Sequence, residues 1–492
     1  MLKAFGFCRI CAASPPVAPT AVADNVSALV DSALDAAESG ADICVFPELC
    51  VTGYTCGDLF YHASLLDAAE AGLASFLAAT RARVTLFVVG LPLRLDGLLI
   101  NGAAACCQGR IIGVVPKSCL PNTQEFYERR WFASGIGLAA QQIRVCGAYL
   151  PLGTGLLFES ASDPACRVGI EVCEDLWSPQ PPSQALAVGG ATIICNLSAS
   201  NERVGKADYR RMLVAAQSAR CLAAYAYAGA GVGESTTDLV FGGHTLLAEN
   251  GRVLAEGERF VRKGTRVLAD VDLAFLLHER RQNAVFADCS AHTAPLRRLT
   301  FGDGTVVERA EHPCVTELIR VVDPHPFVPS DRVSRDERCA EVFAIQSSGL
   351  ATRLLHAGIK AVVVGVSGGL DSALALLAAY EAFDRAGLDR SGVHAVTMPG
   401  FGTTALTLDN ARRLCEGLGV ALEQIDITQA CRQHLADLGH DGESHDITFE
   451  NAQARERTQV LMDRANMLHA LVVGSGDLSE LALGWCTFNG DQ

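Results

Sequence analysis

Residues 361–380 read AVVVGVSGGLDSALALLAAY, and they set the architecture expected for the C-terminal part of the chain. An apolar run with strand character leads into a glycine-rich turn, and apolar residues at helical spacing follow the turn. Three more apolar runs, at 392–398, 421–427 and 470–476, alternate with helical stretches. Strands that alternate with helices form a parallel sheet between helical layers. We therefore predict a doubly wound α/β domain over residues 335–492.

A larger α/β pattern occupies the residues before this domain. From about residue 4 to 275, short apolar runs such as TIICNLS at 192–198 alternate with amphipathic helical stretches. We predict one domain over 1–275. Residues 276–334 are rich in His, Arg and Pro and show little periodicity, so we expect a connection between the domains there.

Length and composition agree with two globular domains. A chain of 492 residues is too long for one ordinary core, and 49% hydrophobic with 19% charged residues indicates a folded protein. The net charge of −15, from 40 Lys and Arg against 55 Asp and Glu, disfavours nucleic acid as a partner. No run approaches about 18 uninterrupted apolar residues, so we expect no membrane span.

The start of the chain and its cysteines indicate the compartment. Residues 1–25 imitate a secretory signal, but Arg9 interrupts the apolar stretch and two prolines follow, so a first strand fits better. Most of the 19 cysteines lie in apolar runs, which indicates buried, reduced thiols and a cytoplasmic protein. Cys8 and Cys11 form the lone C-x-x-C; in a strand they would face opposite sides, so we expect a structural role.

Three strand-end segments of the first domain each carry a reactive group. VFPELCVTGY contains Glu48, VVPKSCLPN contains Lys117, and IEVCEDLW contains Cys173. Amide cleavage through a thioester requires such a set, because a base must take the thiol proton and a cation must stabilise the oxyanion. A structural role is the alternative reading for any one of the 19 cysteines.

The acidic neighbours of Cys173 affect its reactivity. Glu174 and Asp175 follow it directly, and nearby negative charge raises the pKa of a thiol. A shift of one pKa unit corresponds to about 1.4 kcal/mol, so we expect one close ammonium, that of Lys117, to offset one carboxylate. Glu174 and Asp175 are expected to point away from the sulfur or to hold other groups.

Together the three segments resemble the nitrilase, or carbon–nitrogen hydrolase, superfamily, whose domain is an α-β-β-α sandwich. The resemblance implies that Glu48 is the general base, Lys117 the oxyanion stabiliser and Cys173 the nucleophile. PNTQEFYERRWF, residues 121–132, extends it to the glutaminase branch, in which Glu125 would orient Lys117 as an auxiliary carboxylate. The glutamine pocket that the resemblance implies consists of Phe126, Glu174, Trp177, Ser200 and Lys206.

Two positions depart from the glutaminase pattern, and one glycine-rich segment lies outside it. Relatives often carry an aromatic residue where Thr123 stands and an Arg where Lys206 stands. Because Lys pairs with a carboxylate without bidentate geometry, glutamine binding at these points is an open question. GAGVGES at 229–235 resembles G-x-G-x-x-G, but neither a helix nor a suitably spaced acidic residue follows, so we do not expect a nucleotide loop.

The turn SGGLDS at 367–372 is suited to an anion at a helix N-terminus. It lacks the lysine of the G-x-x-x-x-G-K-[ST] motif, and the carboxylate of Asp371 beside phosphates requires a bridging Mg²⁺. A tight strand-to-helix turn without a ligand is the alternative. The backbone N–H groups and hydroxyls expected to face the phosphates belong to Ser367, Gly368, Gly369 and Ser372.

This turn resembles the pyrophosphatase loop of adenylating amidotransferases, and three later segments resemble NAD⁺ synthetase. These segments begin with VTMPGFGTT, ENAQARERT and GSGDLSELA. The resemblance implies a fold like the adenine nucleotide alpha hydrolases, with Thr397, Met398 and Ser475 joining the loop at ATP. It further implies that Glu480 joins Asp371 at Mg²⁺, and that deamido-NAD contacts Asn451, Arg455 and Asp491.

Over its whole length the chain resembles the glutamine-dependent NAD⁺ synthetases. The implied reaction adenylates deamido-NAD with ATP, frees ammonia from glutamine and displaces AMP with the ammonia. The resemblance also implies a homo-oligomer. Relatives continue beyond CTFNGDQ, so we expect an incomplete C-terminal sheet, covered on one face, and an impaired synthetase half.

Three other interpretations remain. A stand-alone nitrilase-type amidase would not need the SGGLDS loop. A synthetase of GMP or asparagine would share that loop, but its glutaminase lacks this triad. A degenerate, non-enzymatic scaffold would not need to keep all three triad residues.

Overall fold

A computed structural model describes residues 2–291, 293–302 and 317–483. The chain forms two compact units, Met1–Val322 (unit 1) and Asp323–Gln492 (unit 2). Within the described ranges, no helix combines the length and the apolar character needed to cross a membrane.

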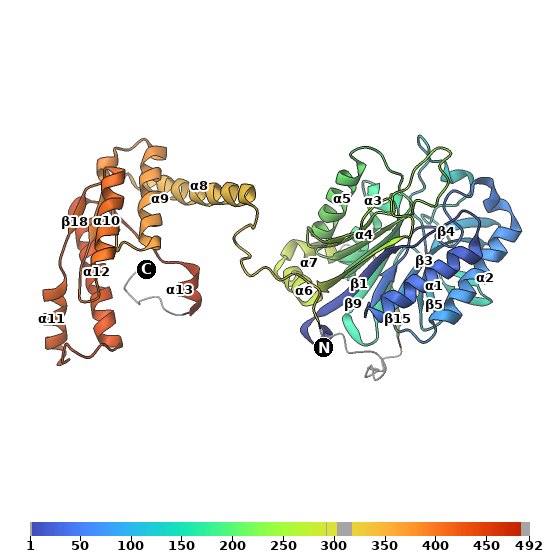
Figure 1. Ribbon diagram of the computed structural model, residues 1–492, viewed down its shortest axis with the longest axis horizontal. Helices are drawn as coiled ribbons and strands as arrows, with labels where there is room; N and C mark the ends of the chain where they lie inside the picture. Colours follow the sequence, from blue (N-terminus) through green and yellow to red (C-terminus); the bar gives the residue numbers. More distant parts are fainter. Residues whose placement is uncertain (1, 292, 303–316, 484–492) are drawn as a thin grey trace. The chain divides into compact units, whose positions relative to one another are not determined.

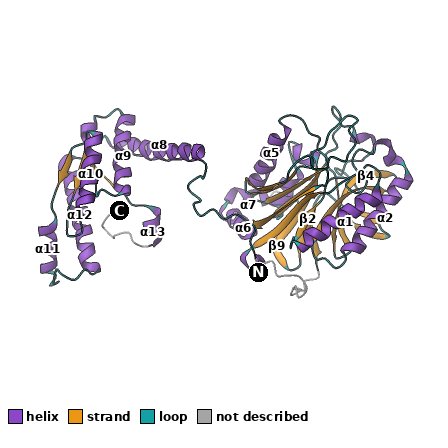
Figure 2. Ribbon diagram, viewed as in Figure 1, coloured by secondary structure: helices purple, strands orange, loops and turns teal. Residues whose placement is uncertain are grey.

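Two β-sheets form the centre of unit 1, drawn as orange arrows in Figure 2. The first sheet contains, in spatial order, β14 (Thr265–Asp272), β1 (Phe7–Ser14), β2 (Ile43–Val45), β3 (Leu86–Leu95), β4 (Leu98–Cys107) and β5 (Arg110–Pro116). The second contains β13 (Arg252–Glu256), β12 (Thr245–Glu249), β11 (Ala224–Gly229), β10 (Ile193–Ser198), β9 (Asp163–Val172), β8 (Leu156–Ser160) and β15 (Arg297–Phe301). A separate hairpin pairs β6 (Gln142–Val145) with β7 (Ala148–Pro151).

Helices cover the outer face of each sheet, which gives the four layers of the expected α-β-β-α sandwich (Figure 1). One apolar core lies between the two sheets; a second packs the first sheet against its helices, and a third packs the second sheet against its own. The helices on the first sheet are α1 (Val22–Glu38) and α2 (Ala63–Thr80), and those on the second are α4 (Pro182–Val188) and α5 (Lys206–Cys221).

Strand β1 shows how the sequence separates these cores. Cys8 and Ile10 belong to the core between the sheets, whereas Cys11 and Ala13 belong to the core under α1 and α2. Successive side chains of a strand point to opposite faces, so residues three apart cannot share one face. The expectation for the C-x-x-C pair is confirmed: both thiols are buried, on opposite sides of the sheet.

Part of the stretch expected as a connection is built into unit 1. Helix α6 (Leu273–Gln282) begins directly after β14, and α7 (Ala284–Ala291) follows it. Strand β15 then extends the second sheet by pairing in parallel with β8. These elements were missed because their short apolar patches are separated by Arg, His and Pro, which obscures any period.

Unit 2 contains the parallel sheet that residues 361–380 predicted. Its order is β18 (Leu422–Gln424), β17 (Val393–Thr397), β16 (Val362–Gly365) and β19 (Leu471–Val473), and all three pairings are parallel. Chain order therefore reverses between β16 and β19, as in doubly wound folds.

Both faces of this sheet carry helices, so the expectation of a sheet covered on one face is wrong for its four described strands. Apolar residues of β16 and β17 point to both sides, and each side has a core with its own helices. One core includes α8 (Arg332–Ala357), α9 (Leu370–Ala386) and α10 (Ala405–Leu418); the other includes α11 (Thr428–Asp437) and α12 (Ile447–Leu468). The short helix α13 (Leu478–Leu483) follows β19.

Candidate active site

Three strands of unit 1 end next to the predicted triad. Glu48 lies three residues beyond β2, and Lys117 and Cys173 directly follow β5 and β9. Strand β2 is parallel to β3, and β4 is antiparallel to both β3 and β5, so β2 and β5 end at the same edge of their sheet. All three side chains are nevertheless buried, and Cys173 belongs to the core between the two sheets.

Glu48 and Lys117 form a completely buried ion pair. Lys117 Nζ lies 2.6 Å from Glu48 Oε1, and neither side chain has any exposed surface. Glu48 also accepts hydrogen bonds from Asn101 Nδ2 at 2.6 Å and from the backbone N–H of Ala199 at 2.9 Å. Such a carboxylate has a fixed position, which a general base requires.

A second buried carboxylate contacts Lys117, and it is Glu128 rather than Glu125. Lys117 Nζ lies 2.6 Å from Glu128 Oε1, and the hydroxyl of Tyr54 donates to the same oxygen at 2.7 Å. Burial lowers the pKa of Lys117, but Glu128 and Glu48 outweigh that effect and hold the pKa well above its usual value. The amine therefore remains a cation, as an oxyanion stabiliser must.

Glu125 lies elsewhere, which corrects the role expected for it beside Lys117. Its carboxylate accepts hydrogen bonds from Asn201 at 2.6 Å and from Arg203 at 2.5 Å. Residues 121–127 form an irregular loop before the 3-10 turn Glu128–Arg130, so the sequence offers no period that distinguishes the two carboxylates. Only the three-dimensional course of the loop brings Glu128 inward.

Cys173 lies in the same pocket and has a strained backbone. Its thiol is buried and lies within the electrostatic reach of Glu48 and Lys117, and its φ of 48° falls in the left-handed region. Non-glycine residues in that region cost of order 1–3 kcal/mol, and such strain is concentrated at functional sites. Helix α3 (Glu174–Trp177) starts immediately after it.

The resting thiol of Cys173 is protonated. Burial is the main cause that raises its pKa; Glu48 raises the pKa further, and Lys117 lowers it without compensating. Lys117 offsets one carboxylate, since it lowers the pKa by more than Glu128 raises it, but burial, which our expectation did not include, and Glu48 keep the pKa raised. The sulfur depends on a base at the moment of attack.

Asp175 connects the end of β9, which precedes Cys173, to the loop that follows Lys117. We expected its carboxylate to point away from the sulfur or to hold other groups, and it holds backbone N–H groups. Its carboxylate accepts the backbone N–H of Val172 at 2.9 Å, that of Ser118 at 3.1 Å and that of Cys119 at 2.6 Å. Burial raises its pKa to about 7, although the backbone donors at Val172 and Cys119 act in the opposite direction. The backbone beside Lys117, at Ser118 and Cys119, and the backbone beside Cys173, at Val172, are thus held by the same buried carboxylate.

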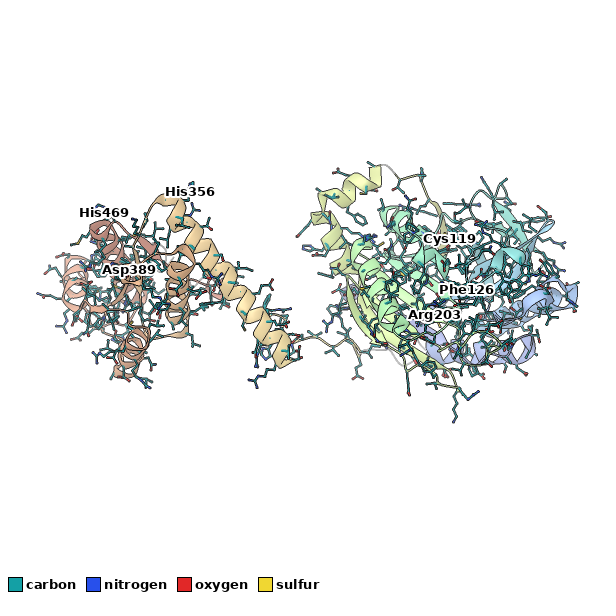
Figure 3. The ribbon with its side chains drawn as sticks, turned by 90° about the horizontal axis from the view of Figure 1, so that it is seen from above. Cys119, Phe126, Arg203, His356, Asp389 and His469 are labelled. Carbon is teal, nitrogen blue, oxygen red and sulfur yellow. The ribbon has the colours of Figure 1, made fainter. Side chains whose placement is uncertain are left out.

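Three of the predicted glutamine-binding residues, Phe126, Trp177 and Lys206, lie close to one another. Lys206 Nζ lies 5.3 Å from the centre of the Trp177 ring and 6.0 Å from that of Phe126, distances typical of cation–π contacts. Phe126 is labelled in Figure 3. Ser200 accepts a 3.3 Å hydrogen bond from Arg210.

Two further pocket positions are less enclosed. Glu174 is half-buried; burial raises its pKa, while Lys117 and Lys206 lower it. Thr123 is exposed, and its carbonyl accepts the backbone N–H of Phe126 at 3.0 Å. Thr123 therefore shapes the loop through its backbone.

Sequence reasoning missed three buried polar residues of this site, Tyr54, Asn101 and Arg210. Each lies in or beside the pocket: Tyr54 contacts Glu128, Asn101 contacts Glu48, and Arg210 contacts Ser200. The available signal was a polar residue within an apolar run, most clearly Asn101 in LLINGAAACC, because buried polar groups are informative. Oδ1 of Asn101 and Oε2 of Glu128 have no hydrogen-bond partner in the described part of the chain.

In unit 2, two predicted ATP-binding segments meet at the reversal of strand order. The SGGLDS turn follows β16, and the segment with Ser475 follows β19, the neighbouring strand. Thr397 ends β17 and is buried, as is Met398. In open α/β sheets, ligands bind at the carboxyl ends of the strands beside such a reversal.

Hydrogen bonds within the SGGLDS turn set its shape. Ser372 Oγ accepts from the backbone N–H of Ser367 at 3.2 Å, and the Gly369 N–H donates to Ser367 Oγ at 3.2 Å. Gly368 has a φ of 88°, and a Cβ there would lie 1.9 Å from the Thr407 carbonyl oxygen. Only glycine fits this position without displacing Thr407.

The remaining unit 2 residues lie on helices. Asp371 is exposed in the first turn of α9, and Asn451 and Arg455 lie one turn apart on α12. Glu480, on α13, accepts the backbone N–H of Asp477 at 3.2 Å. Asp491 lies outside the described residues.

The donors expected at a metal are two carboxylates. Across residues 2–291, 293–302 and 317–483, no group of three or more His, Cys, Asp or Glu side chains forms a ready metal site. Mg²⁺ is usually held by one or two carboxylates together with substrate phosphates, so the assignment of Asp371 and Glu480 to an ion that arrives with ATP stays a prediction.

Comparison with known families divides the chain in two. Residues 9–276 match the Carbon-nitrogen hydrolase family, and residues 343–492 match the NAD synthase family.

Similar proteins with curated names cover nearly the whole chain. The glutamine-dependent NAD(+) synthetase of Mycobacterium tuberculosis is 43% identical over 99% of this chain and 72% of its own length. That of Mycobacterium leprae is 41% identical over the same shares, and that of Thermotoga maritima is 31% identical over 95% of this chain and 74% of its own length.

Solved structures include distant matches. The glutamine-dependent NAD+ synthetase of Acinetobacter baumannii, in complex with ADP, is 23% identical with a TM-score of 0.45, over 99% of this chain and 77% of that one. An amidase of the nitrilase superfamily from Nesterenkonia AN1 is 21% identical with a TM-score of 0.43, over 56% of this chain and 94% of that one.

Proposed function

The chain belongs to the family of glutamine-dependent NAD⁺ synthetases, and we propose that unit 1 frees ammonia from glutamine while unit 2 uses it to amidate deamido-NAD. The observation that carries this proposal is the buried contact of Lys117 with Glu48 at 2.6 Å, beside the Cys173 thiol. A glutaminase requires this set of groups in one pocket.

In the first half of the proposed glutaminase reaction, Glu48 takes the proton of the Cys173 thiol as the sulfur attacks the amide carbonyl of glutamine. The protonated resting thiol makes this transfer necessary. Negative charge then develops on the carbonyl oxygen, and the Lys117 ammonium stabilises it in a water-poor site. Glu48 returns the proton to the leaving nitrogen, so ammonia departs and a thioester remains.

In the second half, a water molecule replaces ammonia. Glu48 takes a proton from the water, which attacks the thioester carbonyl, and glutamate leaves as the thiol regains its proton. Lys117 stabilises the second oxyanion as it does the first. We assign the substrate's charged end to the surroundings of Lys206 and Ser200, with the Phe126 and Trp177 rings along its side.

For unit 2 we propose that the SGGLDS turn binds the phosphates of ATP and that Thr397, Met398 and Ser475 bind its remainder. The backbone N–H groups at the start of α9 suit an anion. Asp371 and Glu480 would hold Mg²⁺, which neutralises phosphate charge when bound. Asn451, Arg455 and Asp491 would contact deamido-NAD. Its nicotinate carboxylate attacks the α-phosphate of ATP and releases pyrophosphate, and ammonia then attacks the acyl adenylate and releases AMP.

The test measures NAD⁺ formed from deamido-NAD and ATP, with either glutamine or ammonium chloride as the nitrogen source. Replacing Cys173 by Ala should abolish glutamine-dependent NAD⁺ formation and glutamate release while leaving ammonium-dependent formation intact. Glutamate release without NAD⁺ from either nitrogen source would instead support the stand-alone amidase. Absence of glutamate release from the unaltered protein would reject the glutaminase.

We also propose that the protein is a cytoplasmic homo-oligomer, as the resemblance implies. Light scattering after gel filtration measures the mass in solution. A mass equal to one 52.0 kDa chain would reject the oligomer.

A further inference from the structure

The GAGVGES segment, 229–235, has no part in the triad, yet it reaches the loop that carries Glu48. It leaves the end of β11 and carries the buried Glu234. Glu234 Oε1 accepts the backbone N–H of Tyr54 at 2.7 Å. Its Oε2 accepts both the backbone N–H of Thr55, at 3.0 Å, and the Thr55 hydroxyl, at 2.6 Å.

A reciprocal contact completes this attachment. The backbone N–H of Ser235 donates to Thr55 Oγ1 at 2.8 Å, so the threonine hydroxyl is both donor and acceptor across the two loops. The glycines of the segment permit the approach: a Cβ on Gly233 would lie 1.7 Å from the Val17 carbonyl oxygen. The glycine pattern that imitates a nucleotide loop thus fits close backbone packing.

Tyr54 connects this attachment to the cation of the active site. Its backbone is held by Glu234, while its hydroxyl donates to Glu128 Oε1 at 2.7 Å. The same oxygen contacts Lys117 Nζ at 2.6 Å. A continuous chain of hydrogen bonds therefore runs from Glu234 through Tyr54 and Glu128 to Lys117.

Glu234 also borders the space beside the general base. A small hollow of about 10 Å³ is lined by residues that include Glu48, Cys50 and Glu234. Burial raises the pKa of Glu234, and Glu48 raises it further, while the donors at Tyr54 and Thr55 lower it. Burying a carboxylate near a second carboxylate costs free energy. This cost favours a role for Glu234 beyond fixing the turn.

We propose that Glu234 is a positioning residue of the glutaminase, which acts through Tyr54 and Glu128 to hold the Lys117 ammonium where the oxyanion forms. This inference rests on the proposed function of unit 1. Lys117 stabilises charge only if its nitrogen lies at the correct distance, and a misplacement of about 1 Å can cost about 100-fold in rate. Glu234 does not touch the substrate, so its loss should lower kcat rather than raise KM.

The experiment measures glutamate release by the chain of 492 residues, first without any substitution and then as Glu234→Gln. Gln keeps the shape but places an NH₂ group against a backbone N–H, so we expect kcat to fall about 10- to 100-fold, with KM for glutamine within about twofold. Glu249→Gln is the control for loss of a buried carboxylate: Glu249 is equally buried, accepts the Asp272 N–H at 2.6 Å and pairs with Arg320 at 2.6 Å, which makes it the more demanding substitution for stability. It should keep kcat within about twofold.

A double-mutant cycle with Tyr54→Phe separates positioning from general stability. If Glu234 acts through the Tyr54 hydroxyl, the double variant should have a kcat close to that of the worse single variant. The inference would be overturned by any of three results. These are a double variant whose loss of kcat equals the product of the two single losses, an unchanged kcat in Glu234→Gln, or an equal loss of kcat in Glu249→Gln. Should Glu234→Gln fail to fold, Thr55→Val decides, since it removes one donor to Glu234 and should lower kcat about 3- to 10-fold without changing KM.

The control without substitution distinguishes this inference from the proposed function. If the unaltered chain releases no glutamate, the proposed glutaminase itself fails. If the unaltered chain releases glutamate and Glu234→Gln has the same kcat, only the positioning role of Glu234 fails.

Discussion

The ammonium of Lys117 lies 2.6 Å from Oε1 of Glu128, completely buried between two carboxylates. Lys117 thus has one carboxylate partner, Glu48, that is proposed to move protons and another that fixes its position. Breaking a buried pair by removing one charge costs several kcal/mol, because the remaining charge loses its compensation.

This arrangement predicts that Glu128→Gln severely impairs glutamine hydrolysis. We expect kcat to fall about 100-fold or more, because oxyanion stabilisation of this kind contributes about 2.7–4 kcal/mol. Glu125→Gln is the matched control, three residues earlier in the same loop. Its partners are Asn201 and Arg203, so its kcat should fall less than about tenfold. Similar losses in both variants would restore Glu125 as the orienting carboxylate.

A second prediction concerns pH. Burial is the main cause that raises the pKa of Glu128, and Lys117 opposes it, so the pKa is about 7. Glu128 is thus neutral below pH 7 and anionic above it, and only the anion forms an ion pair with Lys117. We expect kcat/KM for glutamine to rise with pH through about 7.

The Glu128→Gln variant lacks this ionisation and tests its assignment. Its profile of kcat/KM should lose the rise near pH 7, on a lower plateau. Because Glu128 and Glu48 interact through Lys117, the measured value belongs to the cluster rather than to one residue. A rise near pH 7 that persists in Glu128→Gln would assign the titration to another group.

The sequence predicted the triad but not the residues around it. Glu48 and Lys117 follow strands of one sheet and end at the same edge, whereas Cys173 follows β9 of the other sheet, so the strand pattern alone does not bring the thiol to the other two groups. Glu125 and Glu128 lie in the segment 121–130, which shows no helical or strand periodicity. The sequence therefore does not indicate which of the two carboxylates points toward Lys117. Glu234 and Tyr54 meet across two irregular loops, which no local pattern encodes.

Unit 2 shows the same division. Its parallel strands and the position of the SGGLDS turn after β16 were predictable, because apolar runs alternate with helical periods. The sheet was expected to be covered on one face because relatives continue beyond CTFNGDQ, but α11 and α12, which precede β19, already cover the second face. Strand order also required the structure, since chain order alone does not place β19 beside β16.

A third prediction tests the anchor at Asp175. Its carboxylate accepts three backbone N–H groups, and in Asp175→Asn the amide NH₂ must face at least one of them. We expect a loss of about 1–3 kcal/mol in unfolding free energy and a kcat for glutamine at least about tenfold lower. Urea denaturation and glutamate release measure the two effects.

Asp163→Asn provides the control for this strand. Asp163 lies at the other end of β9, is partly exposed and accepts the Ala165 N–H at 3.0 Å. Both measurements should change little. A normal kcat in Asp175→Asn would show that the anchor does not determine the geometry of Cys173 and Lys117.

A fourth prediction concerns substrate binding at Lys206. Its ammonium lies 5.3 Å from the centre of the Trp177 ring and 6.0 Å from that of Phe126, and a substrate carboxylate would form a charge-assisted contact with it of about 1.5–3 kcal/mol. Lys206→Ala should therefore raise KM for glutamine about 10- to 100-fold with a smaller change in kcat. Lys263→Ala, at an exposed site of the same unit, is the control. An unchanged KM in Lys206→Ala would move the carboxylate site elsewhere.

The last prediction tests unit 2 independently of the glutaminase. Gly368 has a φ of 88°, and a Cβ would approach the Thr407 carbonyl oxygen to 1.9 Å, so Gly368→Ala must displace backbone. The hydrogen bonds that link Ser367, Gly369 and Ser372 depend on that backbone. We expect ATP-dependent NAD⁺ formation from ammonium to fall about 100-fold or more, since donors misplaced by about 1 Å no longer meet the phosphates.

Two comparisons make the result of Gly368→Ala specific. Glutamate release should be unaffected, because the triad lies in unit 1. Gly349→Ala, in the middle of α8 where a Cβ meets nothing within 4 Å, should leave both activities unchanged and raise helix stability by about 1 kcal/mol. NAD⁺ formation at the normal rate by Gly368→Ala would exclude the SGGLDS turn as the phosphate site, because no phosphate cradle built on this backbone survives the displacement of Thr407.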